Sequence, residues 1–513
     1  MLAWTIYISF LGVALLMCLP RDSARAARIV ALLVSLAGLV VALSGAFTYQ
    51  SAQRIATVTD LSWIPTLGIR YQLAADGISL TLVVLTGIAA LVGVLFSWNV
   101  EHRAKEFFAF YLTLIGGVYG VFLSFDLFLL FVFYELAIIP KYFLIAIWGS
   151  TNREYGAMKL ALYSFVGSAM VLVGIIAAYV VSGAHSFSLI ELAKFPFPEH
   201  FQAWAFPLVF LGFGILAGLW PFHTWAPTGH VAAPTAASML LAGVVMKLGA
   251  YGALRVAVTL FPLGLKMWQG PVAILAVIGI VYGAMVALTQ KDFKFVIGYS
   301  SVSHMGFVIL GMVTLNEIGL SGAVLQMFSH GIIAGLLFAV VGRMVYDRTH
   351  TRDLNQLERM HLATVIPFAA VTFAIAGVAS MGLPGFSGFV AELQVLIGAW
   401  HASPTLAVLA GAGILVGVAY TLRAIQKAFL GEPAAGDFAI PAAGGVTKWN
   451  SAGADKSEAG HSLEPISIPE RIGAVILIGA SLLIGLFPRL LLDLIVPSFA
   501  SPLFDSLRKA GGL

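Results

Sequence analysis

Long apolar runs recur along the whole chain, and each is about as long as a helix that crosses a lipid bilayer. Such a helix needs about 20 apolar residues, whereas a membrane β-strand needs only about 10 and alternates in polarity. The runs do not alternate. Only 10% of the residues are charged and 60% are hydrophobic, although soluble domains are about 25% charged. The sequence therefore predicts an all-α polytopic membrane protein.

The runs predict about 14 transmembrane helices. They lie at 1–19, 29–48, 76–98, 107–124, 126–148, 158–182, 204–222, 233–259, 269–289, 293–313, 318–346, 366–400, 404–430 and 472–496. The first range lacks a charged start and a small-residue cleavage site, so we expect a retained span and not a signal peptide. We expect breaks in the seventh span at Pro221 ("LWPFHTWAP") and in the twelfth at Pro384 ("MGLPGFSGF").

Lysine and arginine are distributed unevenly between the predicted loops. The loops that follow the odd-numbered spans hold more than twice as many of them as the other side does. Because loops rich in lysine and arginine stay in the cytoplasm, the first set is cytoplasmic and both termini face outward. The range 431–468 is rich in Ala, Gly, Ser and Pro, which predicts a flexible cytoplasmic loop.

Several classes of function lack support in the sequence. The single cysteine, Cys18, cannot form an internal disulfide or hold an iron–sulfur cluster or a Cys-rich zinc site. There is no Walker-type loop and no dinucleotide fingerprint, and the histidines lack zinc-site spacing. No basic patch is interleaved with aromatic residues, as nucleic-acid binding would require. We expect no cofactor, metal ion or nucleic acid on this chain, which lies in a lipid bilayer.

Among the ionisable side chains within the apolar runs we single out four: Glu135, Lys141, Lys247 and Glu392. An ionised group near the bilayer centre costs at least about 2.5–3.5 kcal/mol. One explanation is structural, because a Glu–Lys pair can hold two helices together. The other is a proton or cation path. Burial lowers the pKa of a lysine and raises that of a glutamate, and a nearby opposite charge shifts both pKa values the other way. Moving the partner then lets a buried lysine release its proton.

Further histidines and charges accompany these four. His304 and His330 lie in the tenth and eleventh spans, where a neutral histidine with one hydrogen bond is cheap to bury, so both explanations stay open. Asp292 and Lys294 lie at the mouth of the tenth span, where we expect a solvated rim or a site of proton uptake. His223 and His230 lie in a loop and could serve either purpose.

Five segments together resemble the antiporter-like membrane subunits of bacterial NADH–quinone oxidoreductase (complex I), the M chain among them. They are "FVFYELAIIP", "WPFHTWAPTGHVAAPTAASMLLAGVVMKLGAYGALR", "TQKDFKFVIGYSSVSHMG", "FSHGIIAGLLF" and "GLPGFSGFVAELQVL". The resemblance extends from about residue 70 to 430 in the family's order. The wider family includes Mrp-type sodium/proton antiporter subunits and membrane subunits of energy-converting hydrogenases.

The resemblance implies two inverted five-helix repeats, helices 4–8 and 9–13, with helices 7 and 12 broken. The chain would divide into helices 1–3 (1–106), the first repeat (107–259), the second repeat (269–430), the cytoplasmic loop (431–468) and helix 14 with its tail (469–513). Breaks at corresponding positions of two halves are typical of transporters.

The resemblance also implies a role, in which redox chemistry in distant subunits drives proton translocation through this one. Glu135 would be the helix-5 glutamate, Lys247 the central lysine and Glu392 the acid leading outward. His304 and His330 would lie on the axis between them. The chain would be an enzyme subunit without a redox centre, in the bacterial inner membrane, among further antiporter-like subunits. NADH and quinone would act on it only indirectly.

The sequence departs from the family pattern at one lysine. The family usually has a lysine in helix 7, where this chain has Leu216, and a methionine after Pro140, where this chain has Lys141. We hypothesise that Lys141 takes over the missing lysine's role. On a straight helix it would lie about 9 Å along and about 240° around from Glu135, so pairing needs a bend at Pro140 or a water. Alternatively, Lys141 faces a neighbouring subunit or lipid headgroups.

The sequence also leaves rival functions open. In the loop after helix 7 the family's "PDAH" is "PTGH" here, with Thr228 in place of the acid, which weakens proton uptake at that point. An Mrp-type cation/proton antiporter subunit or a hydrogenase-linked pump would use the same axis residues. A structural membrane scaffold would use its buried charges only to hold helices together.

Overall fold

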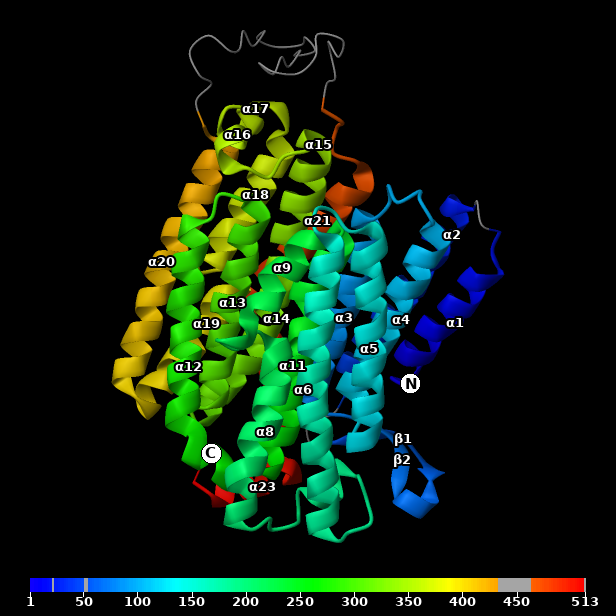
Figure 1. Cartoon of the computed structure of the whole chain (residues 1–513), viewed down its shortest axis with the longest axis vertical. Helices are drawn as coiled ribbons and strands as arrows, with labels where there is room; N and C mark the ends of the chain where they lie inside the picture. The colour runs from blue at the N-terminus through cyan, green and yellow to red at the C-terminus, as the bar shows by residue number, and fades with distance from the viewer. Residues whose placement is uncertain (21–22, 50–53, 432–462, 512–513) are drawn as a thin grey trace.

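The computed structural model describes residues 1–20, 23–49, 54–431 and 463–511, and these form a bundle of long helices (Figure 1). The helices of the first half are α1 (Trp4–Cys18), α2 (Ala24–Thr48), α3 (Gly77–Phe96), α4 (Ala104–Leu123), α5 (Leu127–Trp148), α6 (Arg153–Ser182), α7 (Leu189–Leu192), α8 (Glu199–Ala217), α9 (Trp225–Ala232), α10 (Thr235–Leu240) and α11 (Met246–Gly252). Those of the second half are α12 (Pro262–Thr289), α13 (Phe293–Met312), α14 (Glu317–Ala339), α15 (Asp347–Thr349), α16 (Leu354–Glu358), α17 (Leu362–Val365), α18 (Pro367–Ser380), α19 (Ser387–Ala402), α20 (Pro404–Phe429), α21 (Ile468–Leu486), α22 (Arg489–Phe499) and α23 (Asp505–Lys509).

The polytopic all-α architecture is confirmed, and every predicted span coincides with one helix or with consecutive helical elements. Within the described residues, 12 helices are long and apolar enough to cross a membrane, or up to 13 if a bent pair at the C-terminal end is one span. α1 and α18 are apolar but shorter. The count of fourteen and the repeat layout therefore stay predictions. Most of the predicted cytoplasmic loop lies outside the described residues.

Two strands form a hairpin that the apolar runs did not predict. β1 (Ala56–Ile64) pairs antiparallel with β2 (Ile69–Ala75). The turn ends at Gly68, whose φ of 68° suits glycine. The strands are rich in β-branched and aromatic residues, but at 9 and 7 residues they are much shorter than an apolar run that spans a membrane.

The two ends of the bundle differ. The hairpin and α23 lie at the lower end in Figure 1, called here the hairpin end, and α15, α16 and α17 lie at the upper end, called here the α16 end. The predicted orientation makes the α16 end cytoplasmic. Arg255 lies inside the helical segment Thr235–Val258 and not in a loop, so it does not bear on this orientation.

Two of the long helices are interrupted near prolines. α8 ends at Ala217, Gly218 has a φ of 84°, and a short 3-10 helix, η3 (Phe222–Thr224), leads into α9. Between α18 and α19, Gly382 and Gly385 have φ values of 75° and 101°. Glycine adopts this left-handed backbone without a steric penalty, so these residues let the chain turn inside the bundle.

The centre of the bundle is formed by the segment that contains α10 and α11 and by α14, which are buried along their whole spanning windows. α2 and α20 are mostly exposed and face outward. Three π-helices interrupt the central helices. η4 (Leu241–Val245) and η5 (Ala253–Val258) flank α11, and η6 (Val340–Tyr346) follows α14. π-helical turns occur frequently at functional sites.

Candidate functional site

Lys247 lies at the centre of the bundle, in the first turn of α11 directly after η4. It is fully buried. Its ammonium donates to the carbonyl oxygen of Ala242 at 2.5 Å and contacts Nδ1 of His330 at 2.6 Å. His330 lies on α14, 83 residues away in sequence. The central lysine is thus held between a backbone carbonyl and an imidazole, a group that takes up and releases protons near neutral pH.

A second polar group continues the series from His330. The imidazole of His304, on α13, lies with its ring centroid 5.5 Å from that of His330. Its Nδ1 contacts Oε1 of Glu392 at 2.9 Å, and its Nε2 contacts the hydroxyl of Ser380 at 3.0 Å. Gln326 donates to the same carboxylate oxygen at 3.1 Å. Lys247, His330, His304 and Glu392, called here the central chain, therefore connect α11, α14, α13 and α19.

A small cavity lies along the outer part of the central chain. Its polar lining comes from Ser300, His304, Gln326, Ser329, His330, Ser380 and Glu392. It has room for about one water molecule. Nε2 of His330 has no hydrogen-bond partner among the described residues. The central chain can therefore pass a proton through direct contacts, with one wider step between the two imidazoles.

Glu135 and Lys141 lie on α5, away from the central chain's hydrogen bonds. Glu135 is half-buried, and its Oε1 has no hydrogen-bond partner in the described part of the chain. Lys141 is only 1% exposed, although its neighbours Ile139 and Phe143 are exposed. Neither forms an ion pair within 4 Å with a described residue, but each charge acts on the other. Lys141 therefore does not face lipid.

Leu216, where the family has its helix-7 lysine, is buried near the end of α8. The backbone of Leu216 lies against Gly249, two residues after Lys247. Tyr134 of α5 and Phe213 of α8 pack edge to face with centroids 5.5 Å apart. An apolar contact thus lies between the helix of Glu135 and that of Lys247.

Lys294 is not part of a solvated rim as the sequence predicted, because it is only 2% exposed. Its ammonium donates to the carbonyl of Ala233 at 2.9 Å and lies 3.5 Å from the hydroxyl of Ser238, at the junction of α9 and α10. That hydroxyl donates to the carbonyl of His230 at 2.7 Å. His230 is fully buried, neither ring nitrogen has a partner within the described ranges, and both Lys247 and Lys294 act on it electrostatically.

Asp292 does lie partly in solvent at the α16 end. It caps α13 by accepting from the backbone amides of Lys294 and Phe295, and its other oxygen pairs with Arg352 at 3.1 Å. Burial raises the pKa of Asp292 above its ordinary value, and the Arg352 guanidinium opposes that shift. Asp292 thus caps α13 and pairs with Arg352, and it forms no hydrogen bond with a residue of the central chain.

His223 lies on the short helix η3 and is nearly fully buried. Its ring packs against those of Tyr282 and Tyr299, at 5.3 and 6.2 Å between centroids. Lys159 acts on it electrostatically and donates to the hydroxyl of Thr228 at 3.4 Å. His223 therefore belongs to a separate group at the α8–α9 break.

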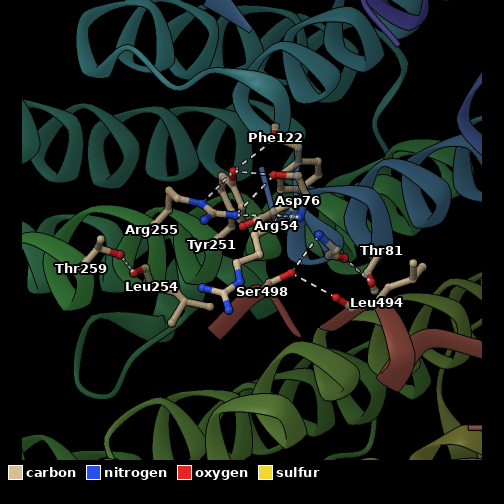
Figure 2. Close-up of polar contacts among 12 residues, drawn as sticks. Arg54, Asp76, Thr81, Phe122, Tyr251, Leu254, Arg255, Thr259, Leu494 and Ser498 are labelled. Atoms are coloured by element: carbon tan, nitrogen blue, oxygen red, sulfur yellow. Dashed lines mark hydrogen bonds and ion pairs between the residues drawn. The ribbon is translucent and has the colours of Figure 1, made fainter. Parts of the chain in front are cut away.

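Sequence reasoning missed two buried ionic clusters. Arg255 of η5 pairs with Asp76 at the start of α3, at 2.7 Å, and both are nearly inaccessible (Figure 2). Near the other end of the bundle, Glu470 of α21 accepts from Arg343 and Arg348 at 2.7 and 2.8 Å. Arg255 lies inside the predicted span 233–259, so the criterion that singled out Lys247 applies to it as well.

Comparisons with known proteins show the family of this chain. Residues 124–417, more than half of the chain, match the family model described as NADH:quinone oxidoreductase/Mrp antiporter, TM. The NADH-quinone oxidoreductase subunit M of Rhodobacter capsulatus is 36% identical over 456 residues, covering 86% of this chain and 83% of that protein. The subunit of the same name from Rickettsia bellii is 39% identical over 388 residues, covering 75% and 76%.

Solved structures give the same result. A chain of respiratory complex I from Thermus thermophilus superposes with a TM-score of 0.83 at 29% identity, covering 98% of this chain and 100% of that one. A chain of the Mrp complex from a Dietzia species gives a TM-score of 0.83 at 21% identity, covering 100% and 98%, which is a likeness of fold. The chain therefore belongs to the family of NADH:quinone oxidoreductase and Mrp antiporter transmembrane proteins.

Proposed function

We propose that this chain translocates protons as an antiporter-like membrane subunit of an NADH–quinone oxidoreductase, driven by redox chemistry in other subunits. The single observation that carries the proposal is the central chain, in which Lys247, His330, His304 and Glu392 succeed one another across four helices. Ionisable groups inside a membrane domain are costly and typically serve ion or proton paths. The similarity to two NADH-quinone oxidoreductase M subunits supports the assignment to this enzyme.

Each member of the central chain can hold or release a proton. Lys247 would pass a proton to Nδ1 of His330, which then releases one from its other nitrogen toward His304. His304 contacts Glu392 directly, so the carboxylate would receive the proton next. Lys294 and His230, buried toward the α16 end, would supply Lys247 from the cytoplasm. NADH and quinone would react on other subunits, and this chain would carry no redox centre of its own.

Lys141 would modulate this relay in place of the helix-7 lysine that Leu216 replaces. The burial of Lys141 supports this role, because a lysine that bound lipid headgroups would be exposed, as Ile139 and Phe143 of α5 are. The Glu135 and Lys141 charges act on each other without forming an ion pair. A movement of the Lys141 ammonium would change the electrostatic field at Glu135, and with it how readily that carboxylate takes up a proton.

The surroundings of the chain follow from the same proposal. We propose that it lies in the bacterial inner membrane with both termini on the periplasmic side, because the loops with most lysine and arginine then lie in the cytoplasm. Its partners would be other membrane subunits, including further antiporter-like ones. The solved structures with the same fold are chains of multi-subunit complexes.

The test uses the whole complex reconstituted in proteoliposomes, with NADH-driven acidification of the lumen as the measurement. Lys247→Ala removes the centre of the relay, and loss of a proton-transfer group slows its step by about 10²-fold or more. We expect a severe loss of acidification in an assembled complex. Lys194→Ala, at an exposed lysine, is the matched control and should pump normally. Normal pumping by Lys247→Ala would support the scaffold alternative instead.

An Mrp-type cation/proton antiporter subunit is the second candidate. The family description covers both groups, and the Mrp chain shares the fold with the same TM-score as the complex I chain. The proteins that co-purify with this chain distinguish the two: NADH dehydrogenase subunits support the first function, and only further antiporter subunits support the second. A nickel hydrogenase would indicate the hydrogenase-linked alternative.

A further inference from the structure

We propose that Arg255, held by Asp76, is a proton seal that closes the hairpin end of the helix carrying Lys247. The inference rests on the proposed function, since a seal matters only where protons move. Arg255 lies eight residues after Lys247 in the same helical segment, about 12 Å along the axis. Its side chain is 1% exposed and that of Asp76 is 0% exposed. A buried charge so close to the relay requires an explanation.

The guanidinium of Arg255 is fixed on several sides (Figure 2). It donates to Oδ1 of Asp76 at 2.7 Å, to the hydroxyl of Ser79 at 3.3 Å and to the hydroxyl of Tyr251 at 3.2 Å. The rings of Phe125 and Tyr251 each lie 5.1 Å from its central carbon. Arg255 therefore cannot swing aside as a mobile relay group would.

Polar groups lead to this pair from the outer surface. The exposed Arg54 donates to the carbonyl of Ala500, and its own carbonyl accepts from the hydroxyl of Tyr49 at 2.8 Å. Burial and the Asp76 carboxylate raise the pKa of Tyr49 to about 12, so this phenol stays protonated beside Asp76. Ser498 accepts from the amide of Gly77, the residue after Asp76.

Polar groups also continue inward from the pair. The hydroxyl of Tyr251 lies 3.1 Å from that of Ser79, and Tyr251 is one helical turn from Lys247. The Tyr251 hydroxyl also donates to the carbonyl of Phe122 at 3.0 Å. The polar contacts from the surface at the hairpin end therefore reach Tyr251, whose position in the helix is four residues from that of Lys247. Without a barrier, this line of polar contacts would be a short route for protons to run back through the membrane.

Arg255 and Asp76 interrupt that line chemically. A proton arriving from outside would first neutralise Asp76 and leave a buried guanidinium without its counter-ion, which is strongly unfavourable. The proton could not pass on through Arg255, because a relay group must give up a proton and arginine does not deprotonate in proteins. A fixed arginine is also a known type of electrostatic barrier to protons in pores. Lys247, His330, His304 and Glu392 in contrast are all groups that exchange protons.

The test measures passive proton conductance of the whole complex in proteoliposomes under a valinomycin potassium potential, without NADH. Asp76→Asn/Arg255→Gln keeps hydrogen-bonding groups and removes both charges. We expect conductance to rise about tenfold or more, which corresponds to a barrier lower by about 1.4 kcal/mol. Thr259→Val removes a buried hydroxyl four residues after Arg255, one that donates to the carbonyl of Leu254, and leaves both charges in place. This variant is the matched control and should stay proton-tight. Unchanged conductance in the double variant would overturn the proposal.

Two further variants make the outcome specific. Adding Lys247→Met to the double variant should abolish the leak, and a leak that persists would mean general loosening and overturn the seal. If the double variant does not assemble, Arg255→Lys keeps a partner for Asp76 but supplies an ammonium that can release its proton. It should leak, and a tight Arg255→Lys complex would contradict the proposal. NADH-driven pumping by the unmodified complex tests the proposed function separately.

Discussion

Lys141 and Lys247 are both buried lysines, but the surroundings of their ammonium groups differ. Lys247 is held by the Ala242 carbonyl and the His330 imidazole. Lys141 has no hydrogen-bond or ion-pair partner among the described residues, and Glu135 is its electrostatic neighbour. The Lys141 ammonium can change position without breaking a hydrogen bond, whereas the Lys247 ammonium is held in place by two. Lys247 is therefore suited to relay a proton, and Lys141 to adjust the field.

Replacing Lys141 tests this division of roles at a single residue. Lys141→Met restores the family's usual residue and leaves no lysine beside Glu135. We expect NADH-driven acidification to fall, while NADH oxidation in the assembled complex continues, because the charge that acts on Glu135 is gone. Adding Leu216→Lys to Lys141→Met should recover part of the loss. Normal pumping by Lys141→Met would show that the lysine has no modulating role.

Sequence reasoning identified single charges better than their partnerships. Lys247, His304, His330 and Glu392 each stand out as ionisable groups within apolar runs, but their contacts span 83 and 88 residues of sequence. No rule of sequence spacing predicts contacts between residues this far apart in the chain. Lys294 was expected at a solvated rim because it begins a span, and only the fold around Ala233 buries it.

At the scale of elements, close backbone contacts bring Lys247 and His330 together. Gly243 in η4 and Gly331 in α14 face each other, and a Cβ on Gly331 would lie 2.7 Å from the Gly243 carbonyl oxygen. Small residues allow membrane helices to approach this closely. The same helices contain the π-helical turns, which the apolar pattern could not predict because a π-helix and an α-helix of this composition look alike in sequence. Helix positions, in contrast, follow from the apolar runs.

Gly331→Ala tests whether this contact positions the relay. The added methyl group meets backbone and the side chain of Leu85 below 3.0 Å, so α14 must shift or the core must strain. We expect a loss of about 1–3 kcal/mol in stability, seen as a lower melting temperature, together with slower pumping because His330 is the adjacent residue. Gly411→Ala in α20, where a Cβ meets nothing within 4 Å, should change neither property.

At the scale of the whole molecule, the buried ionisable residues form three separate groups at different levels along the bundle. The central chain begins on the fully buried segments that carry Lys247 and His330. Asp76 and Arg255 lie near the hairpin end, and Glu470 lies with Arg343 and Arg348 near the α16 end. Only the first group consists entirely of residues that exchange protons readily. The arginines at the two ends pair with carboxylates from distant parts of the chain, so they connect helices that are far apart in sequence.

Glu470 joins the C-terminal helices to the rest of the bundle. It accepts from two arginines that lie 122 and 127 residues earlier, and it also caps α21 at Ser467. Arg348 further donates to the carbonyls of Glu464 and Pro465. These contacts attach the beginning of α21 to the end of the α14–η6 segment.

Glu470→Ala should therefore loosen the molecule as a whole. Removing one member of a buried ionic cluster leaves its partners uncompensated and typically costs about 3–5 kcal/mol. The carbonyls of Glu464 and Pro465 still bind Arg348, so we expect the lower end of that range, measured as a lower melting temperature of the purified complex and a reduced yield of assembled complex. Glu317→Ala, at an exposed glutamate of α14, is the matched control. An unchanged melting temperature in Glu470→Ala would mean that apolar packing alone holds α21, and that the cluster contributes no more than an exposed ion pair does.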